Sequence, residues 1–169
     1  NLIISLISLI MPVLYQSIWE GVLRFVIEEE NDKNKILSTT NYYCIGLTLI
    51  YGIIFYFIAT FLEIKYSLLV FIMAISQMGV SYWQFSARAL KKNSIYSIST
   101  VISAGITIAM NFILIVGLQW GLLGLFIANT VGNVAMIVVL ESNLKLINIS
   151  KNKVFDKKLL KSIILYSLP

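Results

Sequence analysis

Five long runs of apolar residues are the feature that most restricts how this chain can fold. A helix needs about 20 mostly apolar residues to cross the hydrocarbon core of a bilayer. Of the 169 residues, 59% are hydrophobic and only 12% are charged. A domain of this size exposes too much surface to hide so many apolar side chains in one soluble core. We therefore expect an all-α integral membrane protein, and the composition argues against a soluble enzyme or a disordered chain.

Polar breaks separate the five runs, and two breaks are so short that the helices they join must be antiparallel neighbours. Pro12 lies inside the first run, where a membrane helix tolerates it as a kink if neighbours satisfy the freed carbonyl group. We expect residues 1–158 to form one transmembrane bundle and residues 159–169 to be the truncated start of a sixth span, so that the chain is a fragment of a longer protein. The five expected spans cover residues 2–27, 42–62, 66–90, 95–118 and 120–140.

Basic residues are concentrated on one side of this predicted bundle. If the five spans alternate in direction, the first, third and fifth connections share a side. All but one of the 13 basic residues lie in or beside these three connections, and the exception is Lys65. The positive-inside rule places this side in the cytoplasm. The net charge of +5 is thus explained by orientation in a lipid bilayer, and nucleic-acid binding is not expected because the basic residues are divided among separate loops.

Polar side chains within the apolar runs recur at helical spacing. Residues three or four positions apart lie on one face of a helix, so each set forms a stripe. In the first stripe, Glu20 and Arg24 are expected to pair. Because polar groups avoid lipid, stripes on several helices are expected to face each other or a water-filled cavity. The stripes are Gln16, Glu20 and Arg24; Gln77, Ser81, Gln84 and Arg88; Ser99, Ser103, Thr107 and Asn111; and Asn129 and Asn133.

Two interpretations of these stripes remain open. In the first, they line a hydrophilic path for a polar substrate, and the two arginines bind phosphate, which suits the planar guanidinium group. In the second, the uncharged groups hold helices together, and the arginines only reach toward the cytoplasmic headgroups. We favour the second interpretation for the stripe that starts at Ser99. The candidate substrate-binding residues are Gln16, Glu20, Arg24, Gln77, Gln84, Arg88, Asn129 and Asn133.

No catalytic site, metal site or cofactor is expected from the residues. The chain has no histidine and a single cysteine, Cys44. That excludes the commonest general base and makes a metal site of the usual ligands implausible. Gly124, Ala128 and Gly132 recur every four residues and are typical of close helix–helix packing.

Three segments resemble bacterial polysaccharide flippases of the O-antigen exporter type, which belong to the multidrug/oligosaccharidyl-lipid/polysaccharide exporter superfamily. Residues 20–40 are similar to the end of that family's second helix and the loop that follows it. Residues 86–134, with an Ala-Arg before a basic turn and a G-L-x-G-L pattern, resemble its fourth-to-sixth-helix region. Residues 157–169 look like the start of its seventh helix. The resemblance extends over nearly the whole chain.

The resemblance implies an exporter of about 12–14 helices in two lobes, of which this chain would supply most of the N-terminal lobe. Such proteins move an undecaprenyl-diphosphate-linked oligosaccharide across the bacterial inner membrane by alternating access. Arg24 and Arg88 match basic positions of the family pattern, and we hypothesise that they bind the pyrophosphate. Partners would be the bilayer, the lipid-linked oligosaccharide and other membrane proteins of glycan assembly.

Other functions also fit the sequence. One is a drug or cation antiporter of the same superfamily, which an acidic, aromatic-lined cavity would favour. Another is a flippase for a peptidoglycan lipid precursor. A third, of a different class, is a membrane-embedded glycan-assembly enzyme, which would need catalytic acids or a large outer loop.

Overall fold

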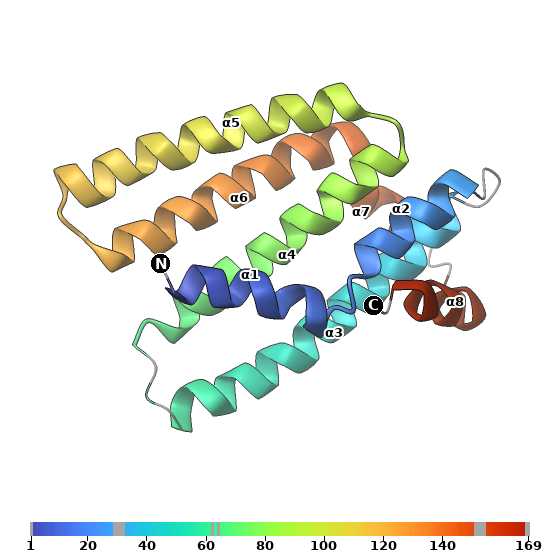
Figure 1. The fold of residues 1–169 in the computed structure, drawn as a ribbon, viewed down its shortest axis with the longest axis horizontal. Helices are drawn as coiled ribbons and strands as arrows, with labels where there is room; N and C mark the ends of the chain where they lie inside the picture. Colours follow the sequence, from blue (N-terminus) through green and yellow to red (C-terminus); the bar gives the residue numbers. More distant parts are fainter. Residues whose placement is uncertain (1, 29–32, 62, 64, 151–154, 168–169) are drawn as a thin grey trace.

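The computed structural model describes residues 2–28, 33–61, 63, 65–150 and 155–167, and every regular element among them is helical (Figure 1). Lys151, Lys153 and Pro169, which contributed to the charge and span predictions, lie outside the described residues. The elements are α1 (Leu2–Leu14), α2 (Ile18–Glu28), α3 (Lys33–Phe61), α4 (Ser67–Ala89), α5 (Asn93–Asn111), the π-helix η1 (Phe112–Gly117), α6 (Leu122–Leu144), α7 (Leu146–Ser150) and α8 (Lys157–Ser167).

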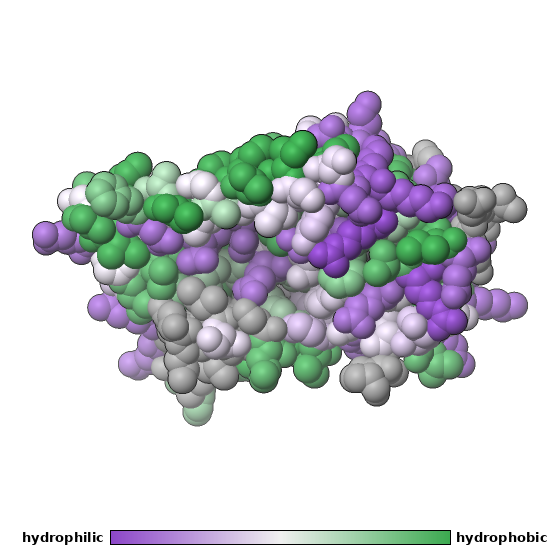
Figure 2. Space-filling model, turned by 45° about the horizontal axis from the view of Figure 1, so that its top comes forward, coloured by the Kyte–Doolittle hydropathy of each residue, from purple (hydrophilic) through white to green (hydrophobic). Residues whose placement is uncertain are grey.

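Four helical segments are long and apolar enough to cross a membrane: α3, α4, α5 with its continuation η1, and α6. The shortest of them contain 23 residues, which at 1.5 Å per residue exceeds the roughly 30 Å of a hydrocarbon core. Their surfaces carry apolar side chains that are almost fully exposed, such as Phe61 (87%) and Val101 (73%). Figure 2 shows a broad hydrophobic ridge over the face that contains α5. The chain is therefore a multi-pass, membrane-embedded all-α protein.

These segments correspond to the second to fifth predicted spans, but their ends differ. α3 begins at Lys33 rather than at Tyr42, and α6 continues to Leu144. The first part of α3, before Tyr42, contains polar residues whose hydrogen bonds can be made within the helix. The Thr40 hydroxyl, for example, donates to the carbonyl oxygen of Ile36 at 2.9 Å. Hydropathy marks the part of a helix that crosses lipid, and it does not mark where the helix itself begins.

The first predicted span is corrected by the structure, because residues 2–27 do not form one continuous helix. α1 ends at Leu14 and α2 begins at Ile18. Between them, Gln16 and Ser17 have φ angles of 53° and 46°, a left-handed conformation that interrupts the helical hydrogen bonds. Pro12 therefore lies just before a break and not within a kinked but unbroken helix. The freed carbonyl oxygen of Leu14 accepts a hydrogen bond from the Tyr51 hydroxyl at 2.6 Å.

α5 and α6 pack closely through small residues. A Cβ atom at Gly132 would overlap the Thr107 hydroxyl and would lie 3.2 Å from the carbonyl oxygen of Ser103. The Ser103 hydroxyl donates to the carbonyl oxygen of Gly132 at 2.8 Å. The predicted close packing of this glycine face is confirmed, and at Ser103 and Thr107 the polar stripe of α5 joins two helices.

α8 packs on α2 and α3. Its Ile163 and Ser167 side chains lie against Gly21 of α2, where a Cβ atom would meet both of them. The described part of α8 ends at Ser167, and the prediction that residues 159–169 begin a further span stays a prediction.

Candidate functional site

A polar pocket of about 310 Å³ opens between α4 and α6, within the membrane-spanning part of the fold. Residues on α4 reach it from one helical face because they are separated by three or four positions. Two residues on α6, four positions apart, complete the lining. Figure 2 shows hydrophilic surface in the middle of one face of the molecule, below the hydrophobic ridge. The pocket is lined by Met73, Gln77, Val80, Ser81, Gln84, Asn129 and Asn133.

Four of the eight predicted site residues therefore meet in one place: Gln77, Gln84, Asn129 and Asn133. The lining contains no charged residue. It offers amide and hydroxyl groups, which both donate and accept hydrogen bonds.

Three of the pocket amides use one end for contacts within the protein. The Asn129 amide donates to the carbonyl oxygen of Leu125 at 2.8 Å, and the Asn133 amide donates to the Ser76 hydroxyl at 3.0 Å. The Gln84 amide donates to the sulfur of Met136 at 3.3 Å. Among the described residues, the other end of each of these three amides forms no hydrogen bond. Each amide is therefore held in place at one end, and its other end is left for a further hydrogen bond.

Arg88 lies one helical turn beyond Gln84 on α4 but does not line the pocket. Its guanidinium group donates to the Tyr96 hydroxyl at 2.6 Å and lies 4.4 Å from the centre of the Tyr96 ring. The Phe85 ring is 5.4 Å away, also within cation–π range. The side chain is exposed and is held by aromatic groups near the basic end of the bundle.

Arg24, Glu20 and Gln16 lie apart from the pocket. The expected pair of Glu20 and Arg24 is corrected: the Nε of Arg24 bonds Glu28 Oε1 at 2.7 Å instead, and the Glu20 side chain is exposed. The Arg24 guanidinium also lies 4.0 Å from the centre of the Tyr166 ring of α8. Both carboxylates are four positions from the arginine, and the aromatic ring of α8 favours the arrangement that is observed.

Gln16 is part of the break between α1 and α2. Its side-chain oxygen accepts a hydrogen bond from the Tyr43 hydroxyl at 3.0 Å. Nearby, the hydroxyls of Tyr15 and Thr48 are 2.8 Å apart. This residue therefore connects the interrupted helix to α3, and it does not face the pocket.

Two residues near the site did not stand out in the sequence. Ser76 supports Asn133 and lies outside the stripe that begins at Gln77, so spacing gave no signal for it. Glu141, at the end of α6, accepts hydrogen bonds from Trp83 Nε1 and from the backbone N–H groups of Leu146 and Ile147, each at 3.0 Å. Only its place near the end of an apolar run could have suggested a structural role.

In the described part of the chain, no group of three or more His, Cys, Asp or Glu side chains is close enough to hold a metal ion. No protein-family model, curated protein or solved structure matches this chain. The fold and the pocket define a membrane-embedded helical protein with an uncharged hydrogen-bonding site at bilayer depth. Any more specific assignment depends on the chemistry of that site.

Proposed function

We propose that this protein is a transporter that moves an undecaprenyl-diphosphate-linked oligosaccharide, such as an O-antigen or capsule repeat unit, across the bacterial inner membrane. The observation that carries the proposal is the amide pocket between α4 and α6. A glycan presents many hydroxyl groups, and free amide ends at fixed positions can exchange hydrogen bonds with them. The family resemblance of residues 20–40, 86–134 and 157–169 supports the same substrate class.

Arg88 suits the diphosphate in this proposal. It follows Gln84 by four residues, so the guanidinium group lies one turn closer to the basic, cytoplasmic end than the amides do. A substrate with its sugar in the pocket would then place its diphosphate toward this arginine, which can donate two parallel hydrogen bonds. Arg24 is engaged by Glu28 and Tyr166, and its contact with the diphosphate would require these partners to release it.

The absence of charge in the pocket lining makes the antiporter alternative less well supported. A cation site at bilayer depth would need a carboxylate to offset the cost of removing the cation from water. We therefore propose transport of a neutral glycan on an anionic carrier, with no bond made or broken by the protein.

The proposal is tested with full-length protein in proteoliposomes that contain the lipid-linked oligosaccharide. Translocation is measured by the accessibility of the glycan to an external glycosidase. We expect Asn129→Leu and Asn133→Leu each to slow translocation about two- to tenfold, since a neutral hydrogen bond contributes about 0.5–1.5 kcal/mol. We expect Arg88→Gln to slow it by about tenfold or more, because bonds to charged groups are stronger, and Arg88→Lys to restore part of the rate.

The matched control is Asn143→Leu, which removes an exposed amide at the end of α6, away from the pocket. This variant should translocate at the normal rate. Normal rates for the pocket variants in folded, inserted protein would refute the proposed substrate site. Formation of a new glycosidic bond by the purified protein would instead favour a glycan-assembly enzyme.

A further inference from the structure

The start of α8 is fixed to α3 by one aspartate. Asp156 Oδ1 accepts the backbone N–H groups of Lys158 at 2.8 Å and Leu159 at 3.1 Å, which makes it the N-cap of α8. Its Oδ2 pairs with Lys35 Nζ at 2.8 Å, and its own N–H donates to the Thr39 hydroxyl at 3.2 Å. The Lys35 ammonium and these N–H groups lower the pKa of Asp156 to about 2. The first turn of α8 is thus anchored to α3 through both the side chain and the backbone of Asp156.

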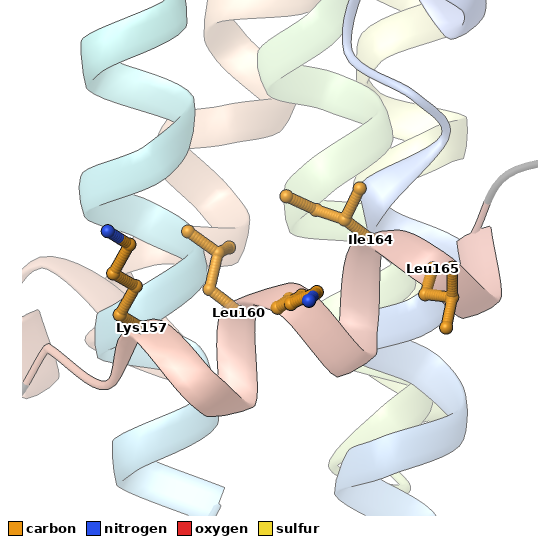
Figure 3. A pocket seen from close by; sticks show the side chains of 5 residues that line it. Lys157, Leu160, Ile164 and Leu165 are labelled. Atoms are coloured by element: carbon orange, nitrogen blue, oxygen red, sulfur yellow. The ribbon is translucent and has the colours of Figure 1, made fainter.

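The far end of α8 is fixed as well. Ile163 and Ser167 occupy the space left by the missing side chain of Gly21, and Tyr166 lies under the Arg24 guanidinium. Leu160 is also buried. α8 therefore contacts α2 and α3 along its whole length. Figure 3 shows this short helix running across the helices beside it.

The orientation predicted from the basic residues places α8 at the level of the cytoplasmic headgroups. Its anchors on α3, Lys35 and Thr39, come before the apolar run that starts at Tyr42. Its anchor on α2, Arg24, belongs to the basic side of the bundle. An amphipathic helix across the bundle at this depth meets lipid phosphates on one side and acyl chains on the other.

A shallow cleft of about 310 Å³ runs along one side of α8, from the buried Leu160 to the exposed Leu165. In Figure 3, Leu160 and Ile164 project from the same side of the helix, and Lys157 stands beside Leu160. Leu165, at the other end, is 71% exposed. Within the described part of the chain, no carboxylate pairs with Lys157, Lys158 or Lys161. The cleft is lined by Lys157, Leu160, Lys161, Ile164 and Leu165.

We propose that this cleft binds an anionic phospholipid of the cytoplasmic leaflet. Lys157 and Lys161 are one helical turn apart, so both ammonium groups can approach a single lipid phosphate. Ile164 and Leu165 provide the apolar surface against which the first part of an acyl chain packs. A soluble anion would contact only the lysines. A phospholipid, which is charged at one end and apolar along the rest, would contact the lysines and the aliphatic side chains together. The inference requires membrane insertion but does not depend on the proposed transport function.

The experiment measures lipid selectivity by native mass spectrometry. Full-length protein in detergent is mixed with equal amounts of phosphatidylglycerol and phosphatidylcholine with identical acyl chains. We expect the wild-type protein to retain phosphatidylglycerol in preference to phosphatidylcholine. Lys157→Gln combined with Lys161→Gln should reduce the preference by about fivefold for each lysine, the effect of one lysine near an anionic surface.

A second double variant, Lys91→Gln with Lys158→Gln, removes the same charge from the same side but leaves the cleft intact. It should keep the wild-type selectivity. Leu165→Ser, at an exposed position that does not endanger folding, should weaken retention of the lipid.

The proposal is overturned by equal retention of both lipids by the wild type, or by equal loss of selectivity in both double variants. It is also overturned if about a tenfold excess of glycerol 3-phosphate displaces the lipid. The last result would identify a site for a soluble anion. Displacement by an acidic peptide would identify a protein partner instead. Because transport is not measured, these results are separate from the test of the amide pocket.

Discussion

At the scale of single residues, Gly132 shows how closely two membrane helices can approach. Helices in lipid gain no hydrophobic free energy from contact with each other, so they associate through close packing and interhelical hydrogen bonds. At Gly132 both are present, because the missing side chain admits Thr107 and the backbone accepts the Ser103 hydroxyl. A side chain at this position would have to displace a neighbouring helix.

We therefore expect Gly132→Ala to destabilise the protein by about 1–3 kcal/mol, the usual cost of overpacking. The control is Gly105→Ala on α5, where a Cβ atom meets nothing within 4 Å. That change should be neutral or should stabilise the helix by about 0.5–1 kcal/mol. Thermal unfolding in detergent measures both, and equal midpoints for the two variants would contradict the packing argument.

Asp156 makes stability depend on pH through the anchor of α8. Its pKa falls from 3.8 to about 2 in the folded protein, so folding favours the ionised carboxylate. This stabilisation is fully present above pH 3.8 and is lost as the pH falls toward 2. The unfolding midpoint of the wild type should exceed that of Asp156→Asn at pH 6, and the difference should shrink below pH 4, about where the unfolded carboxyl titrates. A difference that does not change between these conditions would argue against the anchor.

At the scale of elements, the break between α1 and α2 is the main feature that the sequence did not reveal. Tyr15, Gln16 and Ser17 include no glycine and lie in an apolar run, so composition and periodicity favour an unbroken helix. The break is stabilised from outside, because Tyr43 and Tyr51 of α3 bond to Gln16 and to the Leu14 carbonyl group. Partners that are distant in sequence cannot be read from local pattern. The four spans from α3 to α6 could be predicted because each depends mainly on its own apolar residues.

Two substitutions test this element in opposite directions. Ser17→Gly should stabilise the protein by about 1 kcal/mol, since glycine tolerates the left-handed conformation. Tyr51→Phe should destabilise it by about 1–3 kcal/mol, because it leaves the partly buried Leu14 carbonyl group without a donor. Chemical denaturation in mixed micelles gives both values. If Ser17→Gly is destabilising instead, the segment is helical in the membrane and the break is not present.

At the scale of the whole molecule, the distribution of charge and the four spans predict an orientation in the membrane. Lys65 and Gln119 lie in the turns at one end, and Asn93 and Lys145 lie at the other. In intact cells, cysteine at position 65 or 119 should react with a membrane-impermeant maleimide. Cysteine at position 93 or 145 should react only after permeabilisation. The wild-type protein is the unlabelled control, because Cys44 is buried. A reversed pattern would invert the cytoplasmic assignment.

The candidate site was partly predictable for the same reason that the spans were. Gln77, Gln84, Asn129 and Asn133 lie on long unbroken helices, so their spacing placed them correctly on facing surfaces. Gln16 lies in the break and Arg24 lies in the helix after it, and their spacing therefore did not describe one helical face. The distance of Arg88 from the pocket reflects its aromatic partner Tyr96, which belongs to the next helix.

Glu141 has a mechanical consequence for the end of the bundle where α6 meets α7. One carboxylate joins the Trp83 ring of α4 to the first turn of α7, and α7 in turn packs against α3. If α4 tilts against α6, the ring of Trp83 pulls on the same oxygen atom that holds the backbone N–H of Leu146. Through this one carboxylate, the angle between α4 and α6 is therefore coupled to the position of α7 against α3.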